Sequence, residues 1–208
     1  MSSNERSGPP EGHTGHARRK PARRQGNTDL RIRRTRERLG AALIALIEEK
    51  LIDNVTVREV LDRAEVGRST FYLHYQDKND LLVSQMEHGL EMWSNILCTR
   101  HEKSRRLAPV AEFFAHVASA GKLYRSLVAS GRIQVYFDLA QGYFARGIAR
   151  RLSQIGLPMS DQRELDASSH AFAGNLLSLL KWWLDRGTKE PAKHMDELFH
   201  RMVWKGLR

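Results

Sequence analysis

Apolar residues recur every three or four positions along most of the chain beyond residue 28, a spacing typical of amphipathic helices. The first helix is predicted over Thr28–Lys50, where Thr28 can cap the N-terminus and Asp29 suits the positive end of the helix dipole. Its apolar positions are Ile32, Leu39, Leu43, Leu46 and Ile47. A short connection, residues 51–55, follows this helix.

The next segment has the pattern of two short helices joined by a tight turn. Thr56 and Glu59 have the spacing of a capping box, which starts a helix predicted to reach about Ala64. After a three-residue break at 65–67, a second short helix is predicted over about Arg68–Tyr75. A longer helix begins at Asp77–Asp80 and extends to about His101. Two short helices between two longer ones indicate a helix-turn-helix.

The second short helix has an unusually polar open face. Phe71 and Tyr75 can pack inward, whereas the other side carries Arg68, Ser69, Thr70, Tyr72 and His74. A helix made only for a hydrophobic core does not need so many hydrogen-bond donors on its exposed side. This pattern favours a helix that enters the major groove of DNA, while the helix before it crosses the phosphate backbone.

The segment from Thr56 to Leu82, with its run ThrPheTyrLeuHisTyr, closely resembles the DNA-binding domain of TetR-family transcriptional regulators. The resemblance covers about residues 28–82. Two positions depart from the family pattern. Glu65 stands where the family usually has Gly, so a left-handed backbone there would be strained, and Gly67 stands where Ser often caps the second helix.

The resemblance implies a set of DNA contacts, position by position. Thr56 and Arg58 match positions that contact phosphates and sometimes bases, and Arg68, Ser69 and Thr70 match positions that read base edges. Arg68 is the best candidate, because a guanidinium can bind guanine O6 and N7 together. The matches to phosphate-contacting positions are Tyr72, His74 and Lys78, and Leu73 could touch a thymine methyl group. For Tyr72 the alternative is a half-buried packing residue, and for His74 a helix-end residue.

The rest of the chain, residues 83–208, also has a helical pattern throughout. Five further helices are predicted over Pro109–Ala120, Leu123–Ala129, Arg132–Ile155, Asp161–Arg186 and Pro191–Leu207. Gly187 ends the fourth of these, and Pro191 opens the last. The fold class is therefore all-α with about nine helices: a disordered basic arm (1–27), a helix-turn-helix domain (28–82) and a helical C-terminal domain (83–208).

In the family, the C-terminal domain binds a small effector and dimerises through its last two helices. The resemblance therefore implies a homodimer through about 161–186 and 191–207. Small residues at Ala167, Ala171 and Gly174 would let helices approach closely, although these faces could instead be buried within the monomer. The larger candidates to line an effector pocket are Trp93, Phe113, His116, Tyr124, Tyr136, Phe137, Tyr143, Phe144 and Trp182. The alternative for each aromatic residue is an ordinary place in the core.

Charge adds a second indication of nucleic-acid binding. The 208-residue chain has 34 Lys and Arg against 24 Asp and Glu, a net charge of +10. Residues 1–38 alone hold 11 basic and 4 acidic residues, a net of +7. A basic arm around Arg18–Arg24 could follow phosphates and add salt-dependent affinity. The alternative is a solvated tail that keeps the protein soluble.

Composition excludes several other classes. No apolar run approaches the length of a membrane-spanning helix, and the N-terminus has no secretory signal pattern, so we expect a cytoplasmic protein. With one cysteine, Cys98, and scattered histidines, neither a disulfide nor a metal site is expected. No catalytic constellation or cofactor motif is found, which argues against an enzyme.

The sequence thus favours a homodimeric, DNA-binding transcriptional regulator that a small molecule releases from its double-stranded operator. A repressor is expected, and an activator is the alternative. Two other hypotheses are a small-molecule-binding helical protein with a non-functional helix-turn-helix, and a non-specific DNA-organising protein. The operator, the effector and the regulated genes cannot be read from the residues.

Overall fold

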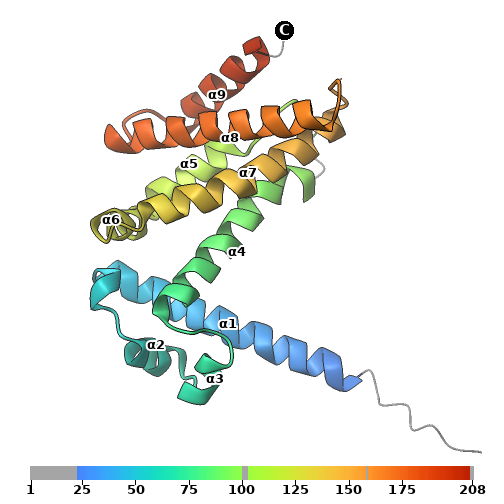
Figure 1. The fold of residues 1–208 in the computed structure, drawn as a ribbon. Helices are drawn as coiled ribbons and strands as arrows, with labels where there is room; N and C mark the ends of the chain where they lie inside the picture. Colours follow the sequence, from blue (N-terminus) through green and yellow to red (C-terminus); the bar gives the residue numbers. More distant parts are fainter. Residues whose placement is uncertain (1–22, 100–102, 158, 207–208) are drawn as a thin grey trace, which may run out of the picture. The chain divides into compact units, whose positions relative to one another are not determined.

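The computed structural model describes residues 23–99, 103–157 and 159–206. These residues form nine α-helices and one 3₁₀ helix, with no strand among them, which confirms the all-α prediction. In chain order the elements are α1 (Arg23–Glu49), η1 (Ile52–Asn54), α2 (Val57–Ala64), α3 (Arg68–Tyr72), α4 (Lys78–Thr99), α5 (Val110–Ser119), α6 (Gly121–Ala129), α7 (Ile133–Ile155), α8 (Gln162–Asp185) and α9 (Ala192–Gly206) (Figure 1). Thr35–Arg208 forms one compact unit, and Met1–Arg34 belongs to another.

The first helix differs from its prediction at the N-terminus. It begins at Arg23, five residues before Thr28, so Thr28 lies inside the helix and is not its N-cap. The segment 23–27 is rich in Arg and Gln, which are good helix formers, and its single Gly26 does not interrupt the helix. The predicted arm therefore overlaps α1 at residues 23–27, and its remainder, residues 1–22, lies outside the described residues.

The second helix of the helix-turn-helix is shorter than predicted. α3 ends at Tyr72 rather than Tyr75, and Leu73–Tyr75 continues as a turn in which the N–H groups of His74 and Tyr75 both donate to the carbonyl of Phe71. Asp77 then accepts hydrogen bonds from the N–H groups of Asn79 (2.7 Å) and Asp80 (2.9 Å), which starts α4. A new helix so close in sequence leaves no room for another turn of α3.

A continuous core holds the helix-turn-helix within residues 35–208. The second half of α1 contributes buried Leu39, Leu43, Leu46 and Ile47, and the residues that pack in the same cluster are Ile52, Val55, Val60, Ala64, Phe71, Tyr75, Leu81 and Leu82. Because nearly every inward position of α2 and α3 is filled by an apolar side chain, burial of these residues fixes both short helices. Their polar positions are thereby left on the outside.

The C-terminal half packs around α4 and α7. α7 packs against α4 on one side and α8 on another, while α9 packs against α5 (Figure 1). α4 and α7 cross so closely at Gly147 that a Cβ there would clash with the backbone carbonyl of Ser94. Only glycine allows this approach.

None of the helices in the described residues is both long and apolar enough to cross a membrane.

Candidate functional site

The start of α2 is fixed by the predicted capping box. The N–H of Glu59 donates to the hydroxyl of Thr56 (3.3 Å), and the N–H of Thr56 donates to the Glu59 carboxylate (2.9 Å). The same carboxylate accepts from Lys50 (2.5 Å). Hydrogen bonds from Lys50, and then from the N–H and hydroxyl of Thr56, lower the pKa of Glu59 to about 2. Both polar groups of Thr56 are thus used inside the protein, which leaves the predicted phosphate contact of its side chain without a free donor.

The turn between α2 and α3 has the geometry that the sequence suggested. Glu65 ends α2 in the left-handed region, with φ 51° and ψ 47°. Its carboxylate pairs with Arg38 of α1 at 3.0 Å. Gly67 is the N-cap of α3 and has an extended backbone, with no side chain to cap the helix. The N–H groups at the start of α3 therefore have no protein side-chain cap.

The outer face of α3 and the turn after it carry most of the predicted DNA contacts. Arg68 and Ser69 are exposed, Tyr72 is 47% exposed and Leu73 is 80% exposed. Phe71 is fully buried and meets Tyr72 edge-on, with ring centroids 5.2 Å apart. The Arg68 guanidinium lies over the Tyr72 ring, 5.5 Å from its centroid. Phe71 thus anchors the helix while its neighbours project outward.

Three other predicted contacts lie at the edges of this face. Thr70 and His74 are half-buried, so each has only part of its side chain available. Arg58 on α2 is exposed and is loosely paired with Asp62 at 3.7 Å. Because exposed ion pairs contribute little, Arg58 is free to exchange Asp62 for a phosphate.

Lys78 has a structural role in addition to the phosphate contact that its position implies. Its ammonium group donates to the backbone carbonyls of Ile52 (2.9 Å), Asp53 (2.9 Å) and Val55 (2.7 Å). An ammonium group has three N–H donors, and all three are used here. The side chain of Lys78 therefore holds η1 against the start of α4. Its phosphate contact stays a prediction, and a bound phosphate would compete with these carbonyls for the ammonium group.

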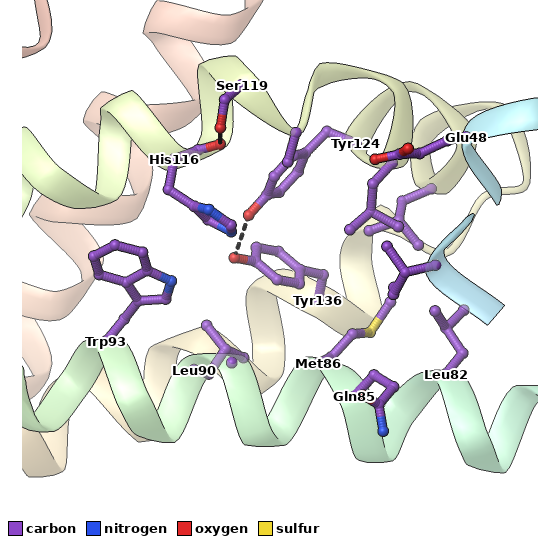
Figure 2. A pocket seen from close by; sticks show the side chains of 15 residues that line it. Glu48, Leu82, Gln85, Met86, Leu90, Trp93, His116, Ser119, Tyr124 and Tyr136 are labelled. Carbon is purple, nitrogen blue, oxygen red and sulfur yellow. Dashed lines mark hydrogen bonds between the residues drawn. The ribbon is translucent and has the colours of Figure 1, made fainter. Parts of the chain in front are cut away.

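A second site lies in the C-terminal half, where a cavity of about 360 Å³ opens between α1, α4, α5, α6 and α7. Four of the predicted pocket residues line it: Trp93, His116, Tyr124 and Tyr136 (Figure 2). Sequence reasoning did not find the remaining lining residues, which are Ile44, Glu48, Leu82, Gln85, Met86, Gly89, Leu90, Ser119, Ala120, Leu123 and Leu127. Most of these are apolar positions at helical spacing, which nothing in the sequence distinguishes from core.

Two buried tyrosines form the polar centre of this cavity. The hydroxyl oxygens of Tyr124 and Tyr136 are 2.6 Å apart, and their rings meet edge-on with centroids 5.2 Å apart. Burial raises the pKa of Tyr124 to about 12, an effect that the hydrogen bond between its hydroxyl and that of Tyr136 partly offsets. Burial, together with the neighbouring Tyr124, also raises the pKa of Tyr136. Burial lowers the pKa of His116, whose ring is tilted against that of Trp93 with ring centroids 5.1 Å apart.

The other predicted pocket residues lie elsewhere. Phe137 lines a second cavity of about 820 Å³, to which Tyr124 also contributes. Tyr143 and Trp182 line neither cavity, and each instead faces an arginine: Arg146 lies over Tyr143 at 4.4 Å and Arg186 over Trp182 at 4.8 Å. The further candidates Phe113 and Phe144 are buried core residues in a 4.8 Å ring contact.

Two side chains that sequence reasoning missed connect the two sites. Ser126 of α6 accepts a hydrogen bond from the N–H of Ile52 in η1 (3.1 Å). Arg132, at the start of α7, binds Asp53 (2.7 Å) and Asn79 (3.2 Å). Ser126 lies on α6 next to the cavity residues Tyr124 and Leu127. One helix, α6, therefore both lines the cavity and contacts η1, which precedes the two short helices. These pairs are 53 to 79 residues apart in sequence, which is why no local pattern shows them.

A family model supports the assignment of the N-terminal part. The model described as bacterial regulatory proteins of the tetR family matches residues 40–84. A curated relative, the HTH-type transcriptional regulator YxbF of Bacillus subtilis (strain 168), is 35% identical over 174 residues. That match covers 79% of this chain, which in turn spans 42% of the relative's length.

Solved structures show the same fold. The dihydroxyacetone kinase operon activator DhaS aligns with a TM-score of 0.62 and 12% identity, over 83% of this chain and 96% of that one. The fatty acid degradation regulator FadR from Bacillus halodurans aligns with a TM-score of 0.57 and 14% identity, over 83% of this chain and 99% of that one. A TetR transcriptional regulator from Streptococcus agalactiae 2603V aligns with a TM-score of 0.51 and 23% identity, over 86% of this chain and 98% of that one.

Residues 40–84 are therefore a segment of the tetR type, and the solved structures show the same fold over most of the chain. The segment matched by the TetR family model runs from the middle of α1 into α4 and contains the DNA contacts predicted for the helix-turn-helix, Thr56 to Lys78. Most of the cavity lies beyond the TetR match, because only Ile44, Glu48 and Leu82 of its lining fall within residues 40–84.

Proposed function

We propose that this protein is a sequence-specific transcriptional regulator of the TetR type that binds double-stranded DNA as a homodimer. One observation carries the proposal. Arg68, Ser69, Tyr72 and Leu73 project together from one exposed face, which buried Phe71 and Tyr75 hold rigidly. A short helix with this composition fits the major groove, where Arg68 can read a guanine and Leu73 a thymine methyl group.

A small molecule bound in the 360 Å³ cavity is proposed to control DNA binding. The cavity is lined in part by α4 and α6, and both helices also contact η1: α6 through Ser126 and α4 through Lys78. A ligand that binds better to one arrangement of α4 and α6 shifts the population toward it, by no more than its difference in affinity for the two arrangements. If the operator overlaps a promoter, the bound protein represses transcription, and its release by the ligand restores transcription.

An activator is the second candidate, because one protein with the same fold, DhaS, is named as an operon activator. The two roles differ in where the operator lies relative to the promoter. Transcription of the regulated gene, measured with and without the protein on a template carrying the selected operator, distinguishes them.

The test of DNA recognition is a selection from a random duplex library with purified protein. We expect the wild type to enrich a palindrome, Arg68→Ala to relax preference at one position of each half-site, and Tyr72→Ala to lower affinity without changing preference. One lost bidentate contact reduces discrimination by about 1–3 kcal/mol.

The matched control is Arg146→Ala, which removes an exposed arginine of α7, away from the helix-turn-helix and from α8 and α9. This variant should select the same palindrome with unchanged affinity. If the wild type enriches no sequence and its binding fades equally for all DNA as salt rises, the helix-turn-helix contacts only the backbone and sequence-specific recognition is wrong.

A further inference from the structure

The charges that line the 360 Å³ cavity indicate which ligands it can hold. Among the described residues of its lining, none is lysine or arginine, and Glu48 is the single carboxylate. Glu48 is exposed and lies at the end of the cavity away from Trp93 and His116 (Figure 2). Besides the two tyrosines, the other polar lining residues are uncharged or titratable at most, namely Gln85, His116 and Ser119, and the rest of the lining is aliphatic side chains, Gly89 and Trp93. A buried anion would therefore find no positive side chain to pair with.

The polar centre of the cavity suits an uncharged group. The Tyr124–Tyr136 contact uses one of the two hydroxyl hydrogens, so the second remains available to a ligand oxygen. Figure 2 shows the His116 ring directed into the same part of the cavity as the two hydroxyl groups. The His116 side chain is partly exposed, and burial of the rest lowers its pKa. This favours the neutral imidazole, which can donate one hydrogen bond and accept another.

The second cavity has the opposite character. Its lining includes Arg125 and Lys181, although Lys181 is paired with Asp185 at 2.7 Å. An anionic amphiphile would find positive charge there, and not in the smaller cavity. The two cavities share Tyr124, so an experiment must show which of them a ligand occupies.

We propose that the 360 Å³ cavity takes an uncharged, largely apolar molecule with one hydroxyl or carbonyl group, which binds at the Tyr124–Tyr136 pair. Carboxylates are excluded because burial of an unpaired ion costs far more than burial of a neutral hydroxyl that keeps a hydrogen bond. Cations are excluded from the interior because the one carboxylate, Glu48, is at the exposed end. This inference names the ligand class for the effector site proposed above and rests on that proposal.

Three probes of equal length test the charge preference: 1-octanol, octanoate and octylammonium. Isothermal titration calorimetry with the full-length protein at pH 7 measures each affinity. We expect octanol to bind at least about ten-fold more tightly than octanoate, since burial of an unpaired ion costs more than the 1.4 kcal/mol of a ten-fold change. Octylammonium should also bind more weakly than octanol. Equal or tighter binding of either ion, or no binding of octanol, overturns the proposal.

Gly89→Leu locates the bound probe. Gly89 lies on α4 in the lining, and a side chain added there meets open space, so leucine should fill the cavity without a clash. Octanol affinity should fall at least about ten-fold, since leucine removes the space in which the alkyl chain is buried. The control Gly142→Leu lies on α7 outside both cavities, where a Cβ meets only the flexible end of Arg146 at 3.4 Å. Unchanged octanol binding by Gly89→Leu would place the probe elsewhere and contradict the proposal.

Failure of this inference is separable from failure of the proposed function. The library selection is made without ligand, so it reports on DNA recognition alone. If octanol binds in the cavity but leaves operator affinity unchanged, the ligand class stands and effector control is wrong. If the ions bind better than octanol and change operator affinity, effector control stands and the ligand class is wrong.

Discussion

Glu65 has a backbone conformation that costs free energy. Its φ of 51° lies in the left-handed region, where a Cβ is crowded and glycine is favoured. Replacement by Gly removes this crowding, and replacement by Ala retains it. Both variants lose the ion pair with Arg38, which joins exposed side chains and contributes little.

We therefore expect Glu65→Gly to be more stable than Glu65→Ala by about 1 kcal/mol, after allowance for the greater freedom of unfolded glycine. Urea denaturation of the two variants measures the difference in the free energy of unfolding. Equal stability would show that the turn accommodates the side chain without strain.

The Tyr124–Tyr136 pair makes stability depend on alkaline pH. Burial raises the pKa of Tyr124 to about 12, from 10 in the unfolded chain, and raises that of Tyr136 as well. Between pH 10 and about pH 12, the unfolded chain loses the Tyr124 hydroxyl proton that the folded protein retains. The contribution to stability is therefore complete below pH 10 and is lost as the pH rises through about 12, by roughly 2–3 kcal/mol for a two-unit shift.

Tyr124→Phe/Tyr136→Phe should remove this part of the pH dependence. Urea denaturation between pH 9 and 12 measures it, with Tyr72→Phe as a control that removes a hydroxyl from a partly exposed ring. The same loss of stability above pH 10 in the double variant would contradict the prediction.

Several residue roles could be predicted from the sequence, and others could not. The capping of α2 by Thr56 and the left-handed Glu65 depend on neighbours within three residues, so a local pattern shows them. Lys78 reaches carbonyls 23 to 26 residues away, and no local pattern shows that. Trp182 and Trp183 are about 100° apart on one helix, so only one of them can face the core. Trp183 is 2% exposed and Trp182 is 40% exposed.

At the scale of the elements, Lys78 is expected to stabilise the link between η1 and α4. Lys78→Met keeps most of the aliphatic stem and removes three charge-assisted hydrogen bonds to carbonyls. The loss should be about 2–3 kcal/mol of unfolding free energy, because the carbonyls are partly buried and charged hydrogen bonds are the stronger ones. Urea denaturation measures it.

The controls separate this structural role from a phosphate contact. Lys205→Met changes an exposed lysine in α9 and should alter stability by less than about 0.5 kcal/mol. If Lys78→Met retains its stability but loses DNA affinity, with a shallower dependence of affinity on salt, the side chain binds phosphate and our assignment is wrong.

The helices themselves were largely predictable. Periodicity predicts helices over 132–155 and 161–186. The observed α7 begins one residue later and ends at the same residue, and the observed α8 is one residue shorter at each end. Periodicity identifies which face of a helix is apolar, but not whether that face meets another helix or surrounds a cavity. Tyr136 and Phe137 show the limit, since adjacent residues of α7 line two different cavities.

At the scale of the whole molecule, the exposed face of α8 bears on the proposed homodimer. Ala167, Ala171 and Ser178 are exposed at helical spacing, and Gly174 is half-buried between them. Small side chains in one row would allow two copies of α8 to approach closely. A two-fold axis brings the same patch of both subunits together, so one substitution acts twice at the interface.

Ala171→Glu should therefore prevent dimerisation, because it would bury two carboxylates near each other with no positive partner. Light scattering after size-exclusion chromatography should give about 48 kDa for the wild type, twice the 23.9 kDa of the chain, and about 24 kDa for the variant. Operator affinity should fall with it, since one helix-turn-helix then binds one half-site. Ala115→Glu, at an exposed position of α5, is the matched control and should remain dimeric. If Ala171→Glu stays dimeric and binds the operator normally, the two copies meet through another face.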